Sequence, residues 1–145
     1  MYKQILVPTD GSKLSEKAVK TALRLASALG ARVTATYVIP PYAAPIYSEA
    51  MMYQPERHRT VAKRAGKKAL DGIERAARAA GVQYGGSALV GADNPWEGIL
   101  KTARSKRCDL IVMASHGRRG LSGLLLGSET AKVLTHSKVP VLVCR

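Results

Sequence analysis

The segment from residue 113 to residue 128 holds the residue types that bind phosphate. It reads Met-Ala-Ser-His-Gly-Arg-Arg-Gly-Leu-Ser-Gly-Leu-Leu-Leu-Gly-Ser. The largely apolar run 109–113 is typical of a buried parallel strand, and the residues from Ser128 onward have a helical pattern. Glycines let backbone N–H groups approach a phosphate closely, and a helix N-terminus adds unpaired donors and a partial positive charge. This order of elements therefore predicts a site for the phosphates of a nucleotide.

A second group of polar residues, 9–12, follows the first predicted strand. In doubly wound sheets, ligands bind beyond the carboxyl ends of the strands, where the strand order reverses. Asp10 is the strongest candidate in this group, either as a hydrogen-bond acceptor or metal-facing carboxylate for a nucleotide, or as an Asx turn or cap for the following helix. Ser128 likewise has two interpretations, an N-cap or a phosphate contact. Both pairs of interpretations stay open.

The sequence lacks the spacing of several well-defined enzyme sites. No Gly-Lys-Ser/Thr follows the glycines, and only Gly11 stands where a dinucleotide fingerprint would begin. His58, His116 and His136 are scattered, without a Ser/Asp or Cys/Asp partner in the pattern of a catalytic triad. No zinc-ligand spacing occurs. We therefore expect a binding protein and assign no catalytic residue.

Strands and helices alternate along the chain. The patterns predict strands at 4–7, 32–38, 83–89, 109–113 and 140–144, and helices at 12–29, 55–80, 94–105 and 128–136. Gly30 ends the first helix, and Pro55 suits the first turn of the second. Asn94 is the expected N-cap of the third helix, with Pro95 first and Glu97 in a capping pattern.

This alternation predicts the fold class. Parallel strands joined by helices need crossover connections, which place helices on both faces of the sheet. Residues 1–145 are therefore expected to form one α/β domain, a doubly wound, Rossmann-like sheet of five parallel strands in the order 3-2-1-4-5. The segment 40–54, with three prolines and three tyrosines, is expected to be an exposed loop.

The charge balance is strongly basic. Lys and Arg total 23 against 10 Asp and Glu, which gives a net charge of +13 at pH 7. A self-repelling, soluble surface explains such an excess, and so does a polyanionic partner. The predicted helix 55–80 holds eight of these basic residues: Arg57, Arg59, Lys63, Arg64, Lys67, Lys68, Arg75 and Arg78. Because no aromatic residues interleave for base stacking, we interpret it as a solvated face and expect no nucleic-acid partner, with a phosphate-backbone surface as the alternative.

Three features bear on location. No apolar run is long enough to span a bilayer, and the first residues lack the apolar length and cleavage site of a signal peptide. Cys108 and Cys144 are expected at opposite ends of their strands, as reduced thiols. We expect a cytoplasmic protein without a membrane partner.

The whole chain resembles the universal stress protein family. The resemblance is carried by residues 5–12, 115–121 with 125–128, and 139–143, in that order and at those separations. The ATP-binding branch of this family has Gly-x-x-Gly, nine residues, and then Gly-Ser or Gly-Thr. Gly117 and Gly127-Ser128 match this pattern, while Ala114 stands at the first glycine position. If Ala114 keeps ordinary strand dihedral angles, the alanine costs little, and we expect nucleotide binding to be retained.

The resemblance implies where a nucleotide would lie. Adenine would lie near Val38, and the ribose and phosphates near Pro8, Thr9, Asp10, Met113, Ala114, Gly117, Gly127, Ser128 and Glu129. Glu129 would repel the phosphates or help to hold a divalent ion, Mg²⁺ or Mn²⁺. A homodimer would form through the last strand, at Val141, Leu142 and Val143, which would otherwise be an aggregation-prone edge.

Two functions follow from the resemblance and the charge. The first is an ATP-binding module of the stress response, regulatory and without strong catalytic activity, with at most slow ATP hydrolysis. The second is a nucleotide-free homodimeric interaction protein that engages a protein or a polyanion, with Ala114 marking a lapsed site.

Overall fold

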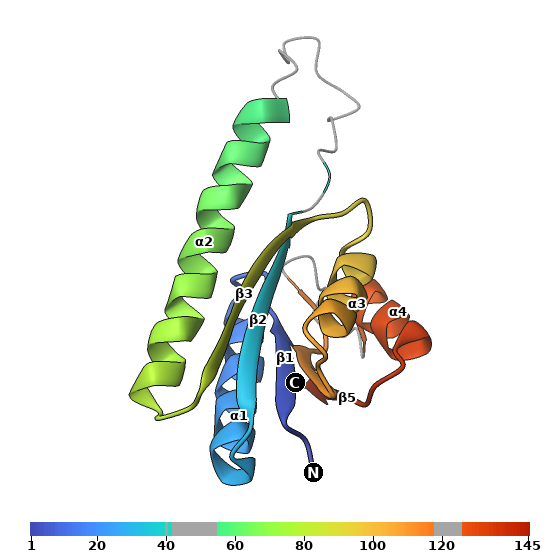
Figure 1. Ribbon diagram of the computed structural model, residues 1–145. Helices are drawn as coiled ribbons and strands as arrows, with labels where there is room; N and C mark the ends of the chain where they lie inside the picture. The colour runs from blue at the N-terminus through green and yellow to red at the C-terminus, as the bar shows by residue number, and fades with distance from the viewer. Residues whose placement is uncertain (40, 42–54, 118–125) are drawn as a thin grey trace.

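Five parallel strands form the centre of the computed structural model, which describes residues 1–39, 41, 55–117 and 126–145 (Figure 1). The strands are β1 (Gln4–Pro8), β2 (Arg32–Ile39), β3 (Tyr84–Gly91), β4 (Leu110–Ala114) and β5 (Val141–Cys144). They lie in the order β3-β2-β1-β4-β5, and every pairing is parallel. The predicted doubly wound fold and strand order are confirmed.

The third strand extends further than the sequence pattern predicts. The predicted strand ends at residue 89, whereas β3 continues to Gly91. Val90 and Gly91 pair with Val38 and Ile39, which also belong to a strand. This correction has a simple cause: backbone pairing with β2 continues past the end of the apolar alternation. The expected loop 40–54 lies outside the described residues, apart from Pro41.

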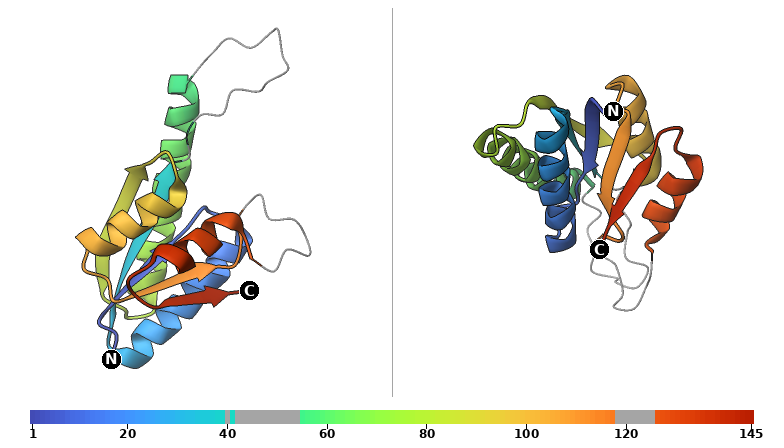
Figure 2. Two further views of the ribbon diagram at one scale, coloured as in Figure 1. Left: turned by 90° about the vertical axis from the view of Figure 1, so that its right-hand side faces the viewer. Right: turned by 90° about the horizontal axis from the view of Figure 1, so that it is seen from below.

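In the described part of the chain, four helices cover the sheet, and Figure 2 shows them on its two faces. Helices α1 (Lys13–Leu29) and α2 (Pro55–Ala79) lie on one face, and α3 (Pro95–Ser105) and α4 (Ser128–His136) lie on the other. Gly30 ends α1 in the left-handed conformation, at the predicted stop. Ser12, predicted as the first helical residue, is instead the N-cap and accepts a hydrogen bond from Ser15 N. No helix in the described part of the chain is long and apolar enough to cross a membrane.

The core consists of two layers, because successive strand side chains point to opposite faces of the sheet. Ile5 and Val7 of β1 pack with α1 and α2, whereas Leu6 packs with α3 and α4. The three side chains are fully buried. The alternation along β1 therefore serves two helix layers at once and fixes the strand in the centre of the sheet.

Helix α2 comes unusually close to the sheet at Gly66. A Cβ atom built there would lie 2.6 Å from Leu89 Cδ1 and 2.7 Å from Tyr37 Cδ1. At Gly72, in contrast, the nearest side-chain atom is 3.9 Å away, at Arg75. Gly66 is thus required for close packing, and Gly72 is not.

The two cysteines are separate free thiols, as expected. Cys108 lies just before β4 in the core layer of α3 and α4, and Cys144 is the last residue of β5. Burial first, and the neighbouring Asp109 carboxylate second, raise the pKa of the Cys108 thiol to about 11.

Candidate functional site

The predicted site residues meet where the chain changes direction across the sheet. Strand β1 lies beside β4, and the chain leaves β1 toward β2 but leaves β4 toward β5. Pro8 is the last residue of β1, and Ala114 is the last residue of β4. The loops after both strands therefore open at the same edge, which is the position at which such sheets bind ligands.

The loop after β1 is held by its own polar side chains. Thr9 Oγ1 lies 3.0 Å from Ser15 Oγ and accepts a hydrogen bond from Gly11 N at 3.1 Å. Asp10 Oδ1 accepts a hydrogen bond from Ser12 N at 2.9 Å, which is the Asx turn considered above. The turn uses one carboxylate oxygen and fixes the orientation of the other.

That second oxygen, Asp10 Oδ2, lies against the loop after β4. A Cβ atom built at Gly117 would be only 2.5 Å from it. The structure thus brings together two predicted site residues that are far apart in the sequence. Any side chain at position 117 would displace the carboxylate, so glycine is needed there for close approach.

Ala114 has ordinary strand geometry. It pairs with Cys144 and is 8% exposed. Among the described non-glycine residues, a positive φ occurs only at Arg107, so the backbone at Ala114 does not favour glycine. Its carbonyl accepts a hydrogen bond from Thr130 Oγ1 at 3.0 Å. Ala114 thus keeps ordinary strand dihedral angles, which is the case in which we expect alanine at this position to cost little in nucleotide binding.

Helix α4 begins with a glycine cap. Its N-cap is Gly127, and Ser128 is the first helical residue, so the interpretation of Ser128 as the N-cap is wrong. The cause is steric: a Cβ atom at Gly127 would lie 3.1 Å from His116 Cα and 3.2 Å from the Ser115 carbonyl oxygen. Gly127 N also donates to that oxygen at 2.7 Å. Because glycine has no side chain to accept from the first turn, this N-terminus remains suited to an external anion.

Glu129 contacts a neighbouring helix. Its Oε2 accepts a hydrogen bond from Trp96 N, in the first turn of α3, at 2.8 Å. Asn94 is the N-cap of α3 by position, but its Nδ2 donates to Glu97 Oε1 at 3.0 Å, and its side chain caps no backbone N–H. The predicted N-cap position of Asn94 is therefore confirmed, but the predicted capping hydrogen bonds from the side chains of Asn94 and Glu97 to the backbone are wrong. The distant carboxylate of Glu129 stabilises the N-terminus of α3 instead.

The remaining predicted residues border this edge on the face of α3 and α4. Met113 is buried in the core layer formed with α3 and α4. Val38, near the end of β2, packs against the same core layer. A Cβ atom at Gly98 of α3 would lie 3.0 Å from Val38 Cγ2, so helix and strand are in close contact. Residues 118–125 of the glycine-rich segment lie outside the described residues.

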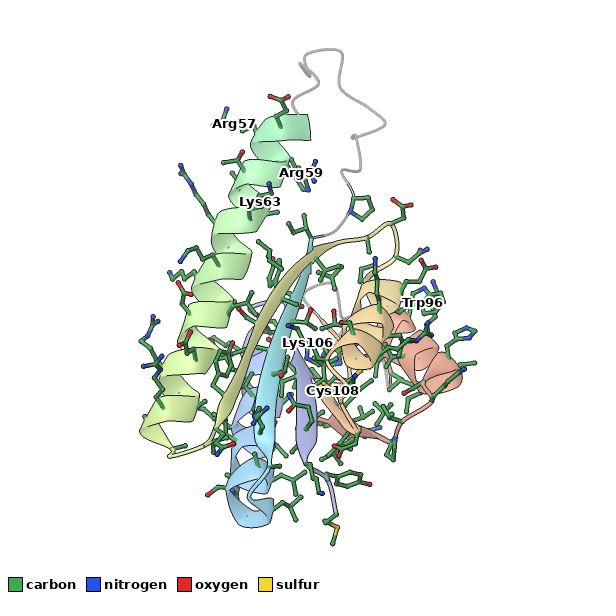
Figure 3. All side chains as sticks on the ribbon, viewed as in Figure 1. Arg57, Arg59, Lys63, Trp96, Lys106 and Cys108 are labelled. Atoms are coloured by element: carbon green, nitrogen blue, oxygen red, sulfur yellow. The ribbon has the colours of Figure 1, made fainter. Side chains whose placement is uncertain are left out.

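Two contacts at the site could not be predicted. Thr130 anchors α4 to the end of β4, and the weak signal for this is its position three residues before the buried Val133. The ring of Trp96, which is labelled in Figure 3, stacks on His136, with centroids 4.7 Å apart. Both contacts join elements that lie distant in sequence, so no local pattern indicates them.

The histidines are spread over three separate places in the described part of the chain. His116 Nδ1 lies 3.1 Å from Ser115 Oγ, but Ser115 is 2% exposed and precedes His116 directly. His58 and His136 lie on α2 and α4. In the described ranges, no three His, Cys, Asp or Glu side chains are grouped to hold a metal ion.

Residues 1–145 match the universal stress protein family. The chain belongs to this family. Over 145 residues it is 34% identical to a universal stress protein of Methanocaldococcus jannaschii, covering 100% of this chain and 83% of the relative. A Thermus aquaticus universal stress protein is 34% identical over 149 residues, with 100% of both chains covered.

Solved structures of the family have the same fold. A universal stress protein in complex with cAMP has a TM-score of 0.72 and 28% identity, covering 99% of this chain and 96% of that one. A universal stress protein of Burkholderia pseudomallei has a TM-score of 0.77 and 28% identity, covering 98% and 95%. The family and fold predicted from the sequence are confirmed.

Proposed function

We propose that this universal stress protein binds an adenine nucleotide, ATP, at the edge between β1 and β4 and acts as a nucleotide-responsive module of the stress response. One observation carries the proposal: Asp10 Oδ2 and Gly117 meet across the switch point of the sheet. A related structure at 28% identity holds cAMP, which supports an adenine nucleotide as the ligand class.

The phosphates would lie at the glycine-capped N-terminus of α4. Gly127 keeps the helix start close to the loop after β4, and Ser128 is exposed there. Backbone N–H groups and the helix dipole favour an anion at this position. The ordinary strand geometry of Ala114 supports retention of the site in this chain.

A divalent ion would depend mainly on the nucleotide. Mg²⁺ commonly uses one or two carboxylates together with substrate phosphates. Asp10, whose Oδ1 accepts a hydrogen bond from Ser12 N, lies at this edge together with Glu129, whose Oε2 accepts one from Trp96 N. We propose Mg²⁺ or Mn²⁺ as a companion of bound ATP. Because neither His116 nor another described residue is placed as a general base, hydrolysis would be slow.

The last strand is proposed as the homodimer contact. In the described sheet, β5 pairs with β4 and forms an edge. Leu142 is 40% exposed there, and Val141 and Val143 are half-buried. Pairing with a second copy would cover this edge. Two free cysteines support a reducing compartment, the cytoplasm.

Asp10→Asn tests the site. Asparagine keeps an Oδ1 acceptor for Ser12 N but replaces Oδ2 by an amide donor, so the turn survives while the acceptor for the ligand is lost. Loss of a hydrogen bond to a charged group costs about 1.5–3 kcal/mol, which is roughly a 10- to 150-fold higher Kd for ATP. Isothermal titration calorimetry on nucleotide-stripped protein measures it.

Asp93→Asn is the matched control, because Asp93 is exposed beyond the end of β3 at the same edge of the sheet. The control should bind ATP like the wild type. Equal affinity of the Asp10 variant and the wild type would contradict the assigned site. A wild-type protein that binds no nucleotide would favour the nucleotide-free interaction protein.

A further inference from the structure

Basic side chains gather on one face of this molecule. The helices α1 and α2, which lie side by side on the same face of the sheet, carry twelve basic and four acidic residues (Figures 1 and 2). The helices α3 and α4 on the opposite face carry only three basic residues, Lys101, Arg104 and Lys132, and two acidic ones, Glu97 and Glu129. A general solubility charge would not need this segregation, so it indicates a surface with a partner.

The basic residues on each helix form a row. On α1 the row is Lys13, Lys17, Lys20 and Arg24, and on α2 it is Arg57, Arg64, Lys68 and Arg75. The separations of three, four and seven residues return to the same side of a helix. All eight side chains are exposed, and both rows lie opposite the residues that each helix buries in the core. Figure 3 shows Arg57 directed away from the sheet.

These rows keep their charge. Two ion pairs occur in the described part of the chain, Lys67–Asp71 at 3.1 Å and Arg78–Glu74 at 2.7 Å. Both use basic residues outside the rows and neutralise two of the three acids of α2. The row residues are thus left to attract an external anion.

The chemistry of the face selects the kind of anion. Among the described residues of α1 and α2, Val61 is the only large apolar residue with an exposed side chain. Neither row contains an aromatic residue. A membrane-surface helix would present apolar anchors, a protein partner would need an apolar centre, and a single strand would need stacking aromatics. A second copy would bring like charge. Phosphates of a nucleic-acid duplex require only exposed cations.

We propose that the two rows bind the phosphate backbone of duplex DNA without sequence preference. The α2 row spans about 27 Å, roughly the rise of eight base pairs. Helix α1 packs on β1 and β4, and α2 packs on β2 and β3, so the strand spacing puts the rows about 10 Å apart. This separation is close to the roughly 12 Å width of the major groove, which phosphates line on both sides. The α1 row starts near the sheet edge proposed for the nucleotide, because Lys13 directly follows Ser12, and it runs along the helix away from that edge.

The sequence alone favours a solvated face for α2, and the structure adds two facts to it. Helix α1 contributes a second row on the same face, and the two helices of the opposite face carry only three basic and two acidic residues. The proposal stands independently of nucleotide binding, because none of its residues belongs to the site at β1 and β4.

Matched charge-neutralising variants test the proposal. The row variant is Lys17→Gln, Lys20→Gln, Arg64→Gln and Lys68→Gln, and the control is Lys101→Gln, Arg104→Gln, Lys132→Gln and Lys138→Gln. Each loses four charges, and all eight positions are exposed. Fluorescence anisotropy of a labelled duplex of arbitrary sequence, about 24 base pairs long so that it exceeds the eight-base-pair row, gives the affinity and its dependence on KCl concentration.

Loss of four phosphate contacts should reduce the slope of log K against log salt by about 3.6, at 0.9 per contact, and weaken binding more than about tenfold at roughly 100 mM KCl. The control should stay close to the wild type. Equal weakening of both variants would overturn the proposal in favour of general charge attraction. Wild-type binding to phosphatidylserine vesicles without binding to duplex DNA would overturn it in favour of a membrane surface.

Discussion

Gly117→Ala should weaken nucleotide binding while leaving the fold intact. The added Cβ would lie 2.5 Å from Asp10 Oδ2, about 1 Å closer than ordinary van der Waals contact permits. Alanine is otherwise acceptable here, since Gly117 is not among the residues with positive φ. Asp10 Oδ1 is held by Ser12 N, so relief of the overlap requires the carboxylate to turn away from the site.

The magnitude follows from this displacement. Loss of one hydrogen bond between the ligand and a charged carboxylate costs about 1.5–3 kcal/mol, a roughly 10- to 150-fold rise in Kd. Because Gly117 is exposed and Asp10 is half-buried, the free energy of unfolding should change by less than about 1 kcal/mol.

Calorimetric titration with ATP and urea denaturation measure the two quantities separately. Gly91→Ala is the matched control, because Gly91 ends β3 at the same sheet edge and a methyl group added there would have no neighbouring atom within 4 Å. The control should match the wild type in affinity. The reasoning is refuted if Gly117→Ala also binds ATP with wild-type affinity.

Three further predictions concern stability and reactivity. In urea denaturation, Gly66→Ala should lower the free energy of unfolding by about 1–2 kcal/mol, net of the gain in helix propensity. Gly72→Ala should raise the free energy of unfolding by about 0.5–1 kcal/mol. Equal effects of the two substitutions would contradict the close approach at Gly66. Glu129→Gln should lower the free energy of unfolding by about 0.5–1.5 kcal/mol through a weaker bond to Trp96 N, and no change would show that the carboxylate charge does not stabilise α3. Cys108 should react slowly with maleimide at about pH 8, since a pKa of about 11 instead of 9.0 leaves a thiolate fraction about a hundredfold smaller. The free energy of unfolding should fall as the pH rises from about 9 to 11, because the thiol of the unfolded chain ionises first. Alkylation of Cys108 in the folded protein at the rate of the unfolded chain would contradict this prediction.

The fold was largely predictable from local patterns. Apolar runs separated by helix-length segments allow little other than a parallel, doubly wound sheet, and stop signals such as Gly30 act within one turn. The end of β3 was predicted too early because Val90 and Gly91 are held by pairing with β2 and not by their own alternation. Strand ends depend on neighbours, which the local sequence does not show.

The site was predictable in its members but only partly in their roles. The glycine spacing and the switch-point rule together predict that Asp10 lies near the glycine-rich loop, and the contact with Gly117 bears this out. The structure excludes Ser128 as the N-cap of α4 and adds a contact of Glu129 that the sequence did not predict. Gly127 takes the cap, where a Cβ atom would be tightly placed 3.1 Å from His116 Cα, and Glu129 finds its partner 33 residues away, at a helix in another segment. Such tertiary contacts leave no periodic signal.

A thermal-shift titration of nucleotide-stripped protein tests the central claim most directly. ATP, ADP, AMP and GTP would each be titrated with and without magnesium. A ligand at about 100 times its Kd adds roughly 2.7 kcal/mol of stability, which corresponds to about 5–11 °C in Tm for a domain of this size. The account predicts a saturable shift with adenine nucleotides and little or none with GTP. No shift with any nucleotide would contradict it.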